Sequence, residues 1–137
     1  MAQFYLLSFI ANLVAGLALS SDFLAERVPF LGGLGKLREK RGSAITLGLV
    51  TAVVGVLKLI FKSPGETVAF AGDLLPGLVG ISLGAVLLTE AFQQKTVTTT
   101  ETAAVDSKKI LSYRVPIGIA GVAVALIHAI MPGVVIL

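Results

Sequence analysis

The sequence contains no cysteine and no tryptophan, and it contains a single histidine. The absence of cysteine excludes disulfides, thiolate metal sites, haem-attachment motifs and cysteine nucleophiles. One histidine leaves little material for a metal centre, because zinc sites combine several histidine, cysteine or carboxylate ligands. No catalytic triad, metal cluster or cofactor fingerprint can be assembled from the other residues. We therefore expect a protein that is not an enzyme and has no catalytic, metal-binding or cofactor-binding residues.

Charged residues are also scarce. They make up 14% of the 137 residues, whereas soluble domains carry about 25%. Hydrophobic residues make up 55%, and the mean hydropathy is +0.95. Such a chain lacks the polar surface that a water-soluble globule needs, so the composition predicts an all-α integral membrane protein. Four transmembrane helices of about 20 residues each would fit within its length.

Four apolar runs are the candidates for these helices, and they cover residues 2–21, 43–61, 74–92 and 112–135. The segment 22–42 is basic and rich in glycine. Its apolar residues at helical spacing fit a short amphipathic helix on the membrane surface, and a plain basic loop fits equally well. The segment 93–109 is polar, rich in threonine and without helical periodicity, which predicts a flexible loop.

The basic residues are distributed unevenly between these segments. Nine lie in or beside the two longer loops, and two lie near the short connection between the second and third runs. Because lysine and arginine accumulate in cytoplasmic loops, we expect the longer loops inside and both termini outside, in a prokaryotic inner membrane. The net charge of +3 then reflects topology and does not indicate nucleic acid. The loop residues expected to face anionic lipid or a partner are Lys36, Arg38, Lys40 and Arg41.

Residues at the ends of the apolar runs in the first half of the chain recur in the second half at an offset of 68 residues. The Pro-Gly pair at 64–65 falls on the pair at 132–133, and Asp22 falls on Glu90. The pattern predicts a tandem duplication of a two-helix hairpin, residues 1–68 and 69–137, within one compact membrane domain. Because each unit crosses the membrane twice, both units have the same orientation in the bilayer. The pseudo-symmetry axis that relates them then runs along the membrane normal.

Small residues recur at helical spacing within the apolar runs. Helices in a bilayer associate through the close backbone approach that such residues allow. Packing within one bundle is favoured over a subunit interface, although the two are compatible. The candidates for helix packing are Asn12, Gly16, Gly48, Ala52, Gly80, Gly84, Gly121 and Ala125.

Polar residues inside apolar runs are candidates for function because they are costly in hydrocarbon. Asn12 stands in the middle of the first run, where a hydrogen bond to a neighbouring helix is expected. Lys58 lies close to an end, from which its ammonium could reach the interface, and His128 is expected to pack at the opposite side of the membrane from the basic loops. Asp22 and Glu90 stand at equivalent helix ends. Ion pairs with Arg27, Lys95 or the loop bases would explain them, and a symmetric cation-binding or docking pair is the alternative.

These features favour a non-catalytic subunit of a membrane complex, which oligomerises or binds a larger membrane protein through small-residue helix faces and basic loops. The alternative is a homo-oligomeric pore or a small transport protein. In both cases the expected partners are the lipid bilayer and further membrane-protein chains.

Overall fold

A computed structural model describes residues 2–61, 74–93 and 109–130. This part of the chain is helical and contains no strand. Its elements are α1 (Ala2–Ala25), the 3-10 helix η1 (Pro29–Leu31), α2 (Gly32–Glu39), α3 (Arg41–Ile60), α5 (Leu74–Gln93) and α7 (Arg114–Ile130). Helices α1, α3 and α5 are long and apolar enough to cross a membrane, and α7 is a shorter apolar helix of 17 residues.

The helix bounds agree closely with the apolar runs. Helices α3 and α5 differ by at most two residues at either end from the expected 43–61 and 74–92. Helix α1 continues beyond residue 21, as far as Ala25. The segment 22–42 contains the short helix α2, so the interpretation as a plain loop is wrong. Residues 131–135, both Pro-Gly pairs and most of the polar loop lie outside the described residues.

A sharp turn separates α1 from α2. The amides of Arg27 and Val28 both donate to the Leu24 carbonyl and so close the last turn of α1. Val28 is then extended, with φ −135° and ψ 91°, as is typical before a proline. Pro29 starts η1, where its missing N–H costs no helical hydrogen bond. The chain therefore leaves α1 and enters α2 in a new direction.

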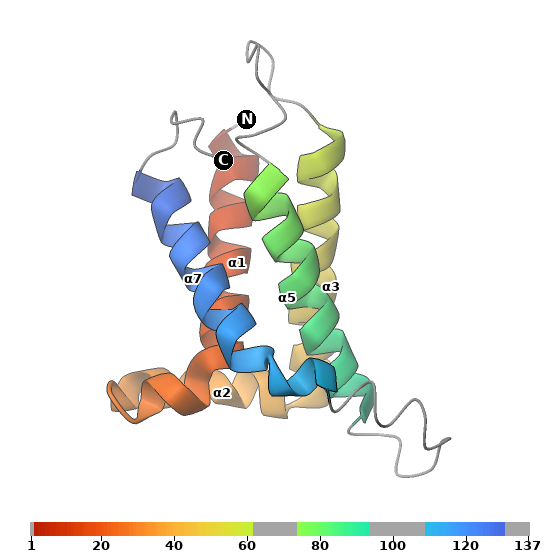
Figure 1. The fold of residues 1–137 in the computed structure, drawn as a ribbon. Helices are drawn as coiled ribbons and strands as arrows, with labels where there is room; N and C mark the ends of the chain where they lie inside the picture. Colours follow the sequence, from red (N-terminus) through yellow and green to blue (C-terminus); the bar gives the residue numbers. More distant parts are fainter. Residues whose placement is uncertain (1, 62–73, 94–108, 131–137) are drawn as a thin grey trace.

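The four long helices form a bundle, and α2 lies across one end of it (Figure 1). Helix α1 packs mainly on α7, and α3 packs mainly on α5. Helices α1 and α5 also touch each other, whereas the backbones of α3 and α7 lie apart within the described ranges and these two helices meet through the side chains of Lys58 and His128. Buried Ala15, Leu19, Leu83, Val86 and Leu87 fill the space between the central pair. We refer to the end crossed by α2 as the α2 end.

Glycines bring the backbones of the paired helices close together. A Cβ atom on Gly84 would lie 2.6 Å from the Gly48 carbonyl oxygen and 2.7 Å from Ala52 Cβ. A Cβ atom on Gly16 would lie 2.8 Å from the Gly118 carbonyl oxygen. Atoms do not approach this closely without a shift, so larger residues here would separate the helices.

The other helix-packing candidates also face the inside of the bundle. A Cβ atom on Gly80 would lie 2.9 Å from Asn12 Oδ1, and one on Gly121 would lie 2.7 Å from Leu83 Cδ1. Ala125 is 1% exposed. Sequence reasoning missed Gly55, whose Cβ atom would lie 2.7 Å from the carbonyl oxygen of Gly77, another glycine that it missed. The small residues therefore serve contacts within the chain.

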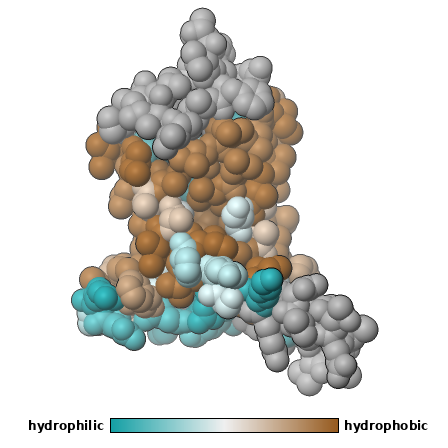
Figure 2. All heavy atoms as spheres, in the orientation of Figure 1, coloured by the Kyte–Doolittle hydropathy of each residue, from teal (hydrophilic) through white to brown (hydrophobic). Residues whose placement is uncertain are grey.

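Large apolar side chains cover the outside of the bundle. Figure 2 shows them as a broad hydrophobic band, with hydrophilic residues gathered along the α2 end. Every long helix contributes to this apolar belt; its members include Leu6, Leu7, Ile10, Leu49, Val50, Val53, Val56, Leu75, Leu78, Ile119, Leu126 and Ile127, each at least 37% exposed.

Candidate functional site

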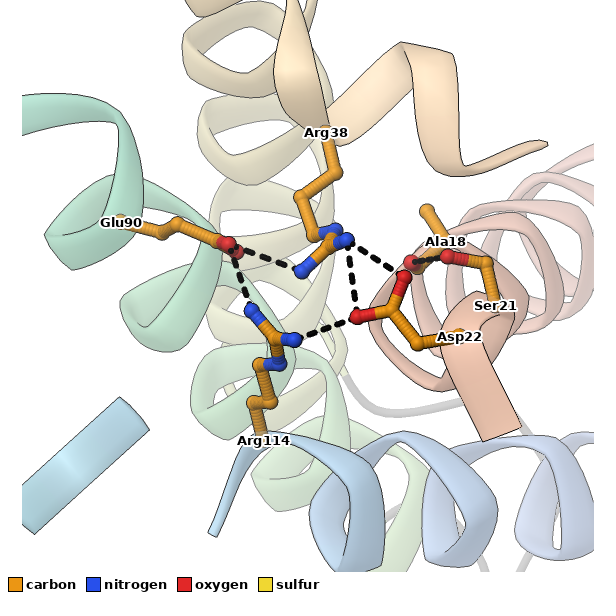
Figure 3. Close-up of polar contacts among 6 residues, drawn as sticks. All are labelled: Ala18, Ser21, Asp22, Arg38, Glu90 and Arg114. Carbon is orange, nitrogen blue, oxygen red and sulfur yellow. Dashed lines mark hydrogen bonds and ion pairs between the residues drawn. The ribbon is translucent and has the colours of Figure 1, made fainter. Parts of the chain in front are cut away.

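Four charged side chains meet at the α2 end, each from a different helix (Figure 3). Asp22 lies in the last turn of α1, Arg38 near the end of α2, Glu90 in the last turn of α5 and Arg114 at the start of α7. These four residues are termed the charged quartet.

The two arginines of the charged quartet each bind both carboxylates. Arg38 Nη2 donates to the two carboxylate oxygens of Asp22 at 2.9 and 3.1 Å, and its Nη1 donates to Glu90 Oε1 at 3.0 Å. Arg114 Nη1 donates to the same Glu90 oxygen at 3.2 Å, and its Nη2 donates to Asp22 Oδ2. The result is a closed ring of alternating charges that joins α1, α2, α5 and α7.

Burial differs across the charged quartet. The Arg38 side chain is 6% exposed and that of Glu90 is 13% exposed, whereas Arg114 reaches 31% and Asp22 reaches 50%. Glu90 Oε2 is buried and has no hydrogen-bond partner among the described residues. A buried charge is tolerated only when it is paired, because desolvation of an isolated ion is very costly. The quartet as a whole is neutral, and this allows Arg38 to lie inside the protein.

The register of α2 directs Arg38 into the bundle. Gly35 faces α1 so closely that a Cβ atom there would lie 2.8 Å from Ser21 Oγ. Ser21 in turn donates this hydroxyl to the Ala18 carbonyl. Arg38 follows Gly35 by three residues, nearly one helical turn, and so shares its face. The chain next turns at Lys40, which is extended with φ −76° and ψ 109°.

Arg38 corrects one expectation from the sequence. It was expected to face lipid or a partner together with Lys36, Lys40 and Arg41, but it is buried by its ion pairs with two carboxylates. Lys36 and Lys40 are exposed, and Arg41 is half-buried. The amphipathic pattern could not distinguish buried Arg38 from exposed Lys36 and Lys40, because a sequence pattern does not show which face of α2 packs against the rest of the bundle.

The structure brings Asp22 and Glu90 together through shared arginines. Arg27, considered as a partner, instead lies over the Phe23 ring, with its Cζ 4.2 Å from the ring centroid. Lys95 lies outside the described residues. Sequence reasoning counted Arg114 only as a topology marker. The available signal was its register: positions 114, 118, 121 and 125 share one helical face, and the last three carry buried small residues.

A second polar cluster lies toward the opposite end of the bundle. Lys58 Nζ lies 3.0 Å from His128 Nε2 and 5.6 Å from the centroid of the Tyr5 ring. The rings of Tyr5 and His128 are 4.6 Å apart, and the Tyr5 hydroxyl donates to the His128 carbonyl. Lys58 was expected to extend toward the interface. It is only 8% exposed, because α1 and α7 cover it.

Asn12 lies inside the bundle between the two clusters. It is 2% exposed, and its Nδ2 donates to the carbonyl oxygen of Pro76 on α5 at 2.9 Å. This is the interhelical hydrogen bond that its position in the first apolar run suggested. Buried Thr51 donates its hydroxyl to Leu47 within α3. Polar side chains thus occur inside the bundle at several depths.

The charged quartet consists of hydrogen-bonded ion pairs, in which the carboxylates accept from the two arginines. Within the described ranges, no group of three or more histidine, cysteine, aspartate or glutamate side chains could hold a metal ion. The charged quartet therefore links α2 to the ends of α1, α5 and α7.

A model of a protein family matches residues 1–128. The chain belongs to this family. The matched range begins before α1 and ends at His128 in α7, so it includes the charged quartet and the second polar cluster. No curated protein and no solved structure matches the chain.

Proposed function

We propose that this chain is an integral membrane protein with four spans, acting as a non-catalytic accessory or oligomerising subunit of a membrane complex. The observation that carries the proposal is the distribution of side chains: Asn12, Thr51 and Lys58 are buried, whereas large apolar side chains form the exposed belt. In water such a belt would favour aggregation, but in a bilayer it contacts lipid or another apolar chain. Helix α3, with 20 residues, is about 30 Å long, which matches the hydrocarbon core.

The helix pairing supports the proposed tandem duplication. An offset of 68 residues exchanges α1 with α5 and α3 with α7, so the α1–α7 pair corresponds to the α5–α3 pair. Gly16 and Gly84 correspond, and each lies against a glycine carbonyl of its paired helix. Asp22 and Glu90 also correspond, and both bind the same two arginines.

The burial of the small residues changes where a partner would bind. Gly16, Gly48, Gly80, Gly84 and Gly121 are all used inside the bundle. They are therefore unavailable for the subunit interface considered from the sequence. A second chain would instead contact the apolar belt, and cytoplasmic partners would meet the exposed lysines of α2. The proposed topology, with α2 on the cytoplasmic side, follows from the distribution of basic residues.

Native mass spectrometry of the gently solubilised protein tests this function. We expect either a multiple of the 14.1 kDa chain or a complex with a larger membrane protein. Substitution of Val53 in the belt by tryptophan should alter such an assembly, whereas the conservative change Val53→Ile should not. A strictly monomeric chain in several mild detergents and in native-lipid nanodiscs would contradict the proposal.

Transport is the second candidate, and the polar side chains inside the bundle favour it. Ionisable residues within membrane spans mark ion or proton pathways in many transporters. Here Lys58 and His128 lie toward one end, Asn12 lies between, and the charged quartet closes the other end. The buried leucines between α1 and α5 would have to separate for a path to open. Proteoliposomes containing a pH-sensitive dye test for proton flux, and flux lost in Glu90→Gln but kept in Lys36→Gln would favour transport over an accessory role.

A further inference from the structure

The turn between α1 and α2 carries apolar side chains that contact little of the protein. Phe30 in η1 is 86% exposed, the highest value among the large hydrophobic residues that the structure describes, and Val28 is 46% exposed. Phe23, on the last part of α1, is 39% exposed. We refer to residues 23–31 as the elbow. Figure 1 shows it projecting sideways from the bundle at the α2 end.

The direction of the elbow is determined by contacts on the inner face of α2. Gly35 lies against Ser21, and Arg38 is held by the charged quartet, so α2 cannot roll about its axis without breaking these contacts. The opposite face of α2 then carries exposed Gly33 and Lys36, and exposed Lys40 follows directly after the helix. An apolar projection and two exposed lysines therefore lie at the same end of the bundle.

Basic side chains outnumber acidic ones around the elbow. Arg27 lies over the Phe23 ring, which keeps its charge beside an apolar surface. Lys36, Lys40 and Arg41 follow on α2 and at the start of α3, while the nearby exposed carboxylates outside the quartet belong to Glu26 and Glu39. A surface that combines exposed apolar side chains with an excess of basic residues fits the interface of an anionic membrane.

We propose that the elbow is a docking surface for anionic phospholipid, with Phe30 inserted at the level of the headgroups and Lys36 and Lys40 beside the phosphates. The inference rests on the membrane placement proposed above. Lipid is favoured as the occupant because the elbow projects where the apolar belt meets the hydrophilic α2 end (Figure 2). At that level a bilayer changes from hydrocarbon to headgroups, where a mixed apolar and basic surface is stable.

The absence of tryptophan makes a direct test possible, since Phe30→Trp introduces a single indole fluorophore. Phe30 is almost fully exposed, so the substitution leaves the packing intact. The full chain is reconstituted in phosphatidylcholine vesicles that contain equal fractions of brominated phosphatidylcholine or brominated phosphatidylglycerol, which quench tryptophan on contact. Gly33→Trp is the companion variant on the face of α2 that carries Lys36, and nothing lies within 4 Å of its Cβ position, so it also leaves the packing intact. Val53→Trp reports on the belt.

We expect brominated phosphatidylglycerol to quench Phe30→Trp about twofold more than brominated phosphatidylcholine, since each nearby lysine attracts anionic lipid. Adding Lys36→Gln and Lys40→Gln should remove this excess. Gly33→Trp should also be quenched more by brominated phosphatidylglycerol, because it shares a face of α2 with Lys36, and Val53→Trp should be quenched equally by both lipids.

Each alternative outcome identifies a different error. Equal quenching of Phe30→Trp by the two lipids would overturn the selection of anionic lipid. Quenching of Phe30→Trp by neither lipid would overturn the docking of the elbow on lipid, and additional protection from aqueous acrylamide would then assign the elbow to a second copy of the chain. An unquenched Val53→Trp would instead refute the proposed membrane placement itself.

Discussion

Arg38→Gln tests whether the charged quartet holds the α2 end of the bundle together. Arg38 donates three hydrogen bonds to two carboxylates and is 6% exposed in its side chain. Loss of one partner from a buried ion pair costs about 3–5 kcal/mol, because the other charge stays buried. Here Asp22 is half-exposed and can be hydrated, and Glu90 keeps Arg114 at 3.2 Å. We therefore expect a loss near the lower limit, about 3 kcal/mol in the free energy of unfolding.

The measurement is unfolding by dodecyl sulfate in mixed micelles, followed by the helical circular dichroism of the purified chain. Lys36→Gln is the matched control, because it removes the same charge from an exposed position on the same helix. It should change the unfolding free energy by no more than about 0.5 kcal/mol. Arg38→Lys should fall between the two, since an ammonium lacks the planar fork that reaches both carboxylates.

A double-mutant cycle separates the ion pair from other effects of the substitution. We expect Arg38→Gln and Glu90→Gln to be less harmful together than the sum of the single changes, with a coupling of about 1–3 kcal/mol. Equal stability of Arg38→Gln and Lys36→Gln would refute the reasoning, and so would strictly additive effects of the two quartet substitutions.

Four further substitutions test the packing of the bundle in the same assay. Gly84→Ala should destabilise it by about 1–3 kcal/mol, because the new methyl group would lie 2.6 Å from a backbone oxygen. Gly33→Ala, with open space around its Cβ, should have the opposite sign and stabilise by about 0.4–1 kcal/mol; two changes of the same sign would contradict the packing. Asn12→Ala removes the hydrogen bond to α5 and should cost about 0.6–1.7 kcal/mol, and no loss would mean that the bond contributes nothing. Tyr5→Phe removes the hydroxyl that donates to α7 and should cost about 0.5–1.5 kcal/mol, with an unchanged midpoint as the contrary result.

The positions of the long helices could be read from the sequence because they depend on local properties. An apolar run of about 20 residues satisfies its backbone hydrogen bonds by forming a helix, whatever its neighbours are. The bounds of α3 and α5 accordingly lie close to the ends of their runs. The spacing of small residues also indicated which faces would pack, since residues three or four positions apart share a helix face.

The sequence did not show which charged side chains of different helices form ion pairs. Asp22 had several basic residues within reach along the chain, and composition does not distinguish Arg27, which lies over Phe23, from Arg38, which is buried beside Glu90. The environment of Lys58 was equally open, because burial at a helix end depends on the helices that cover it.

The sequence by itself determined that this chain is helical, how long its apolar helices are and which of their faces carry small residues, because each of these follows from contacts within one turn or one run. The tertiary structure decided which charges pair, since the contact of Gly35 with Ser21 sets the rotation of α2 and so brings Arg38 between Asp22 and Glu90. A pairing between residues 52 positions apart depends on how the helices are placed in space, and this information appears only after they pack.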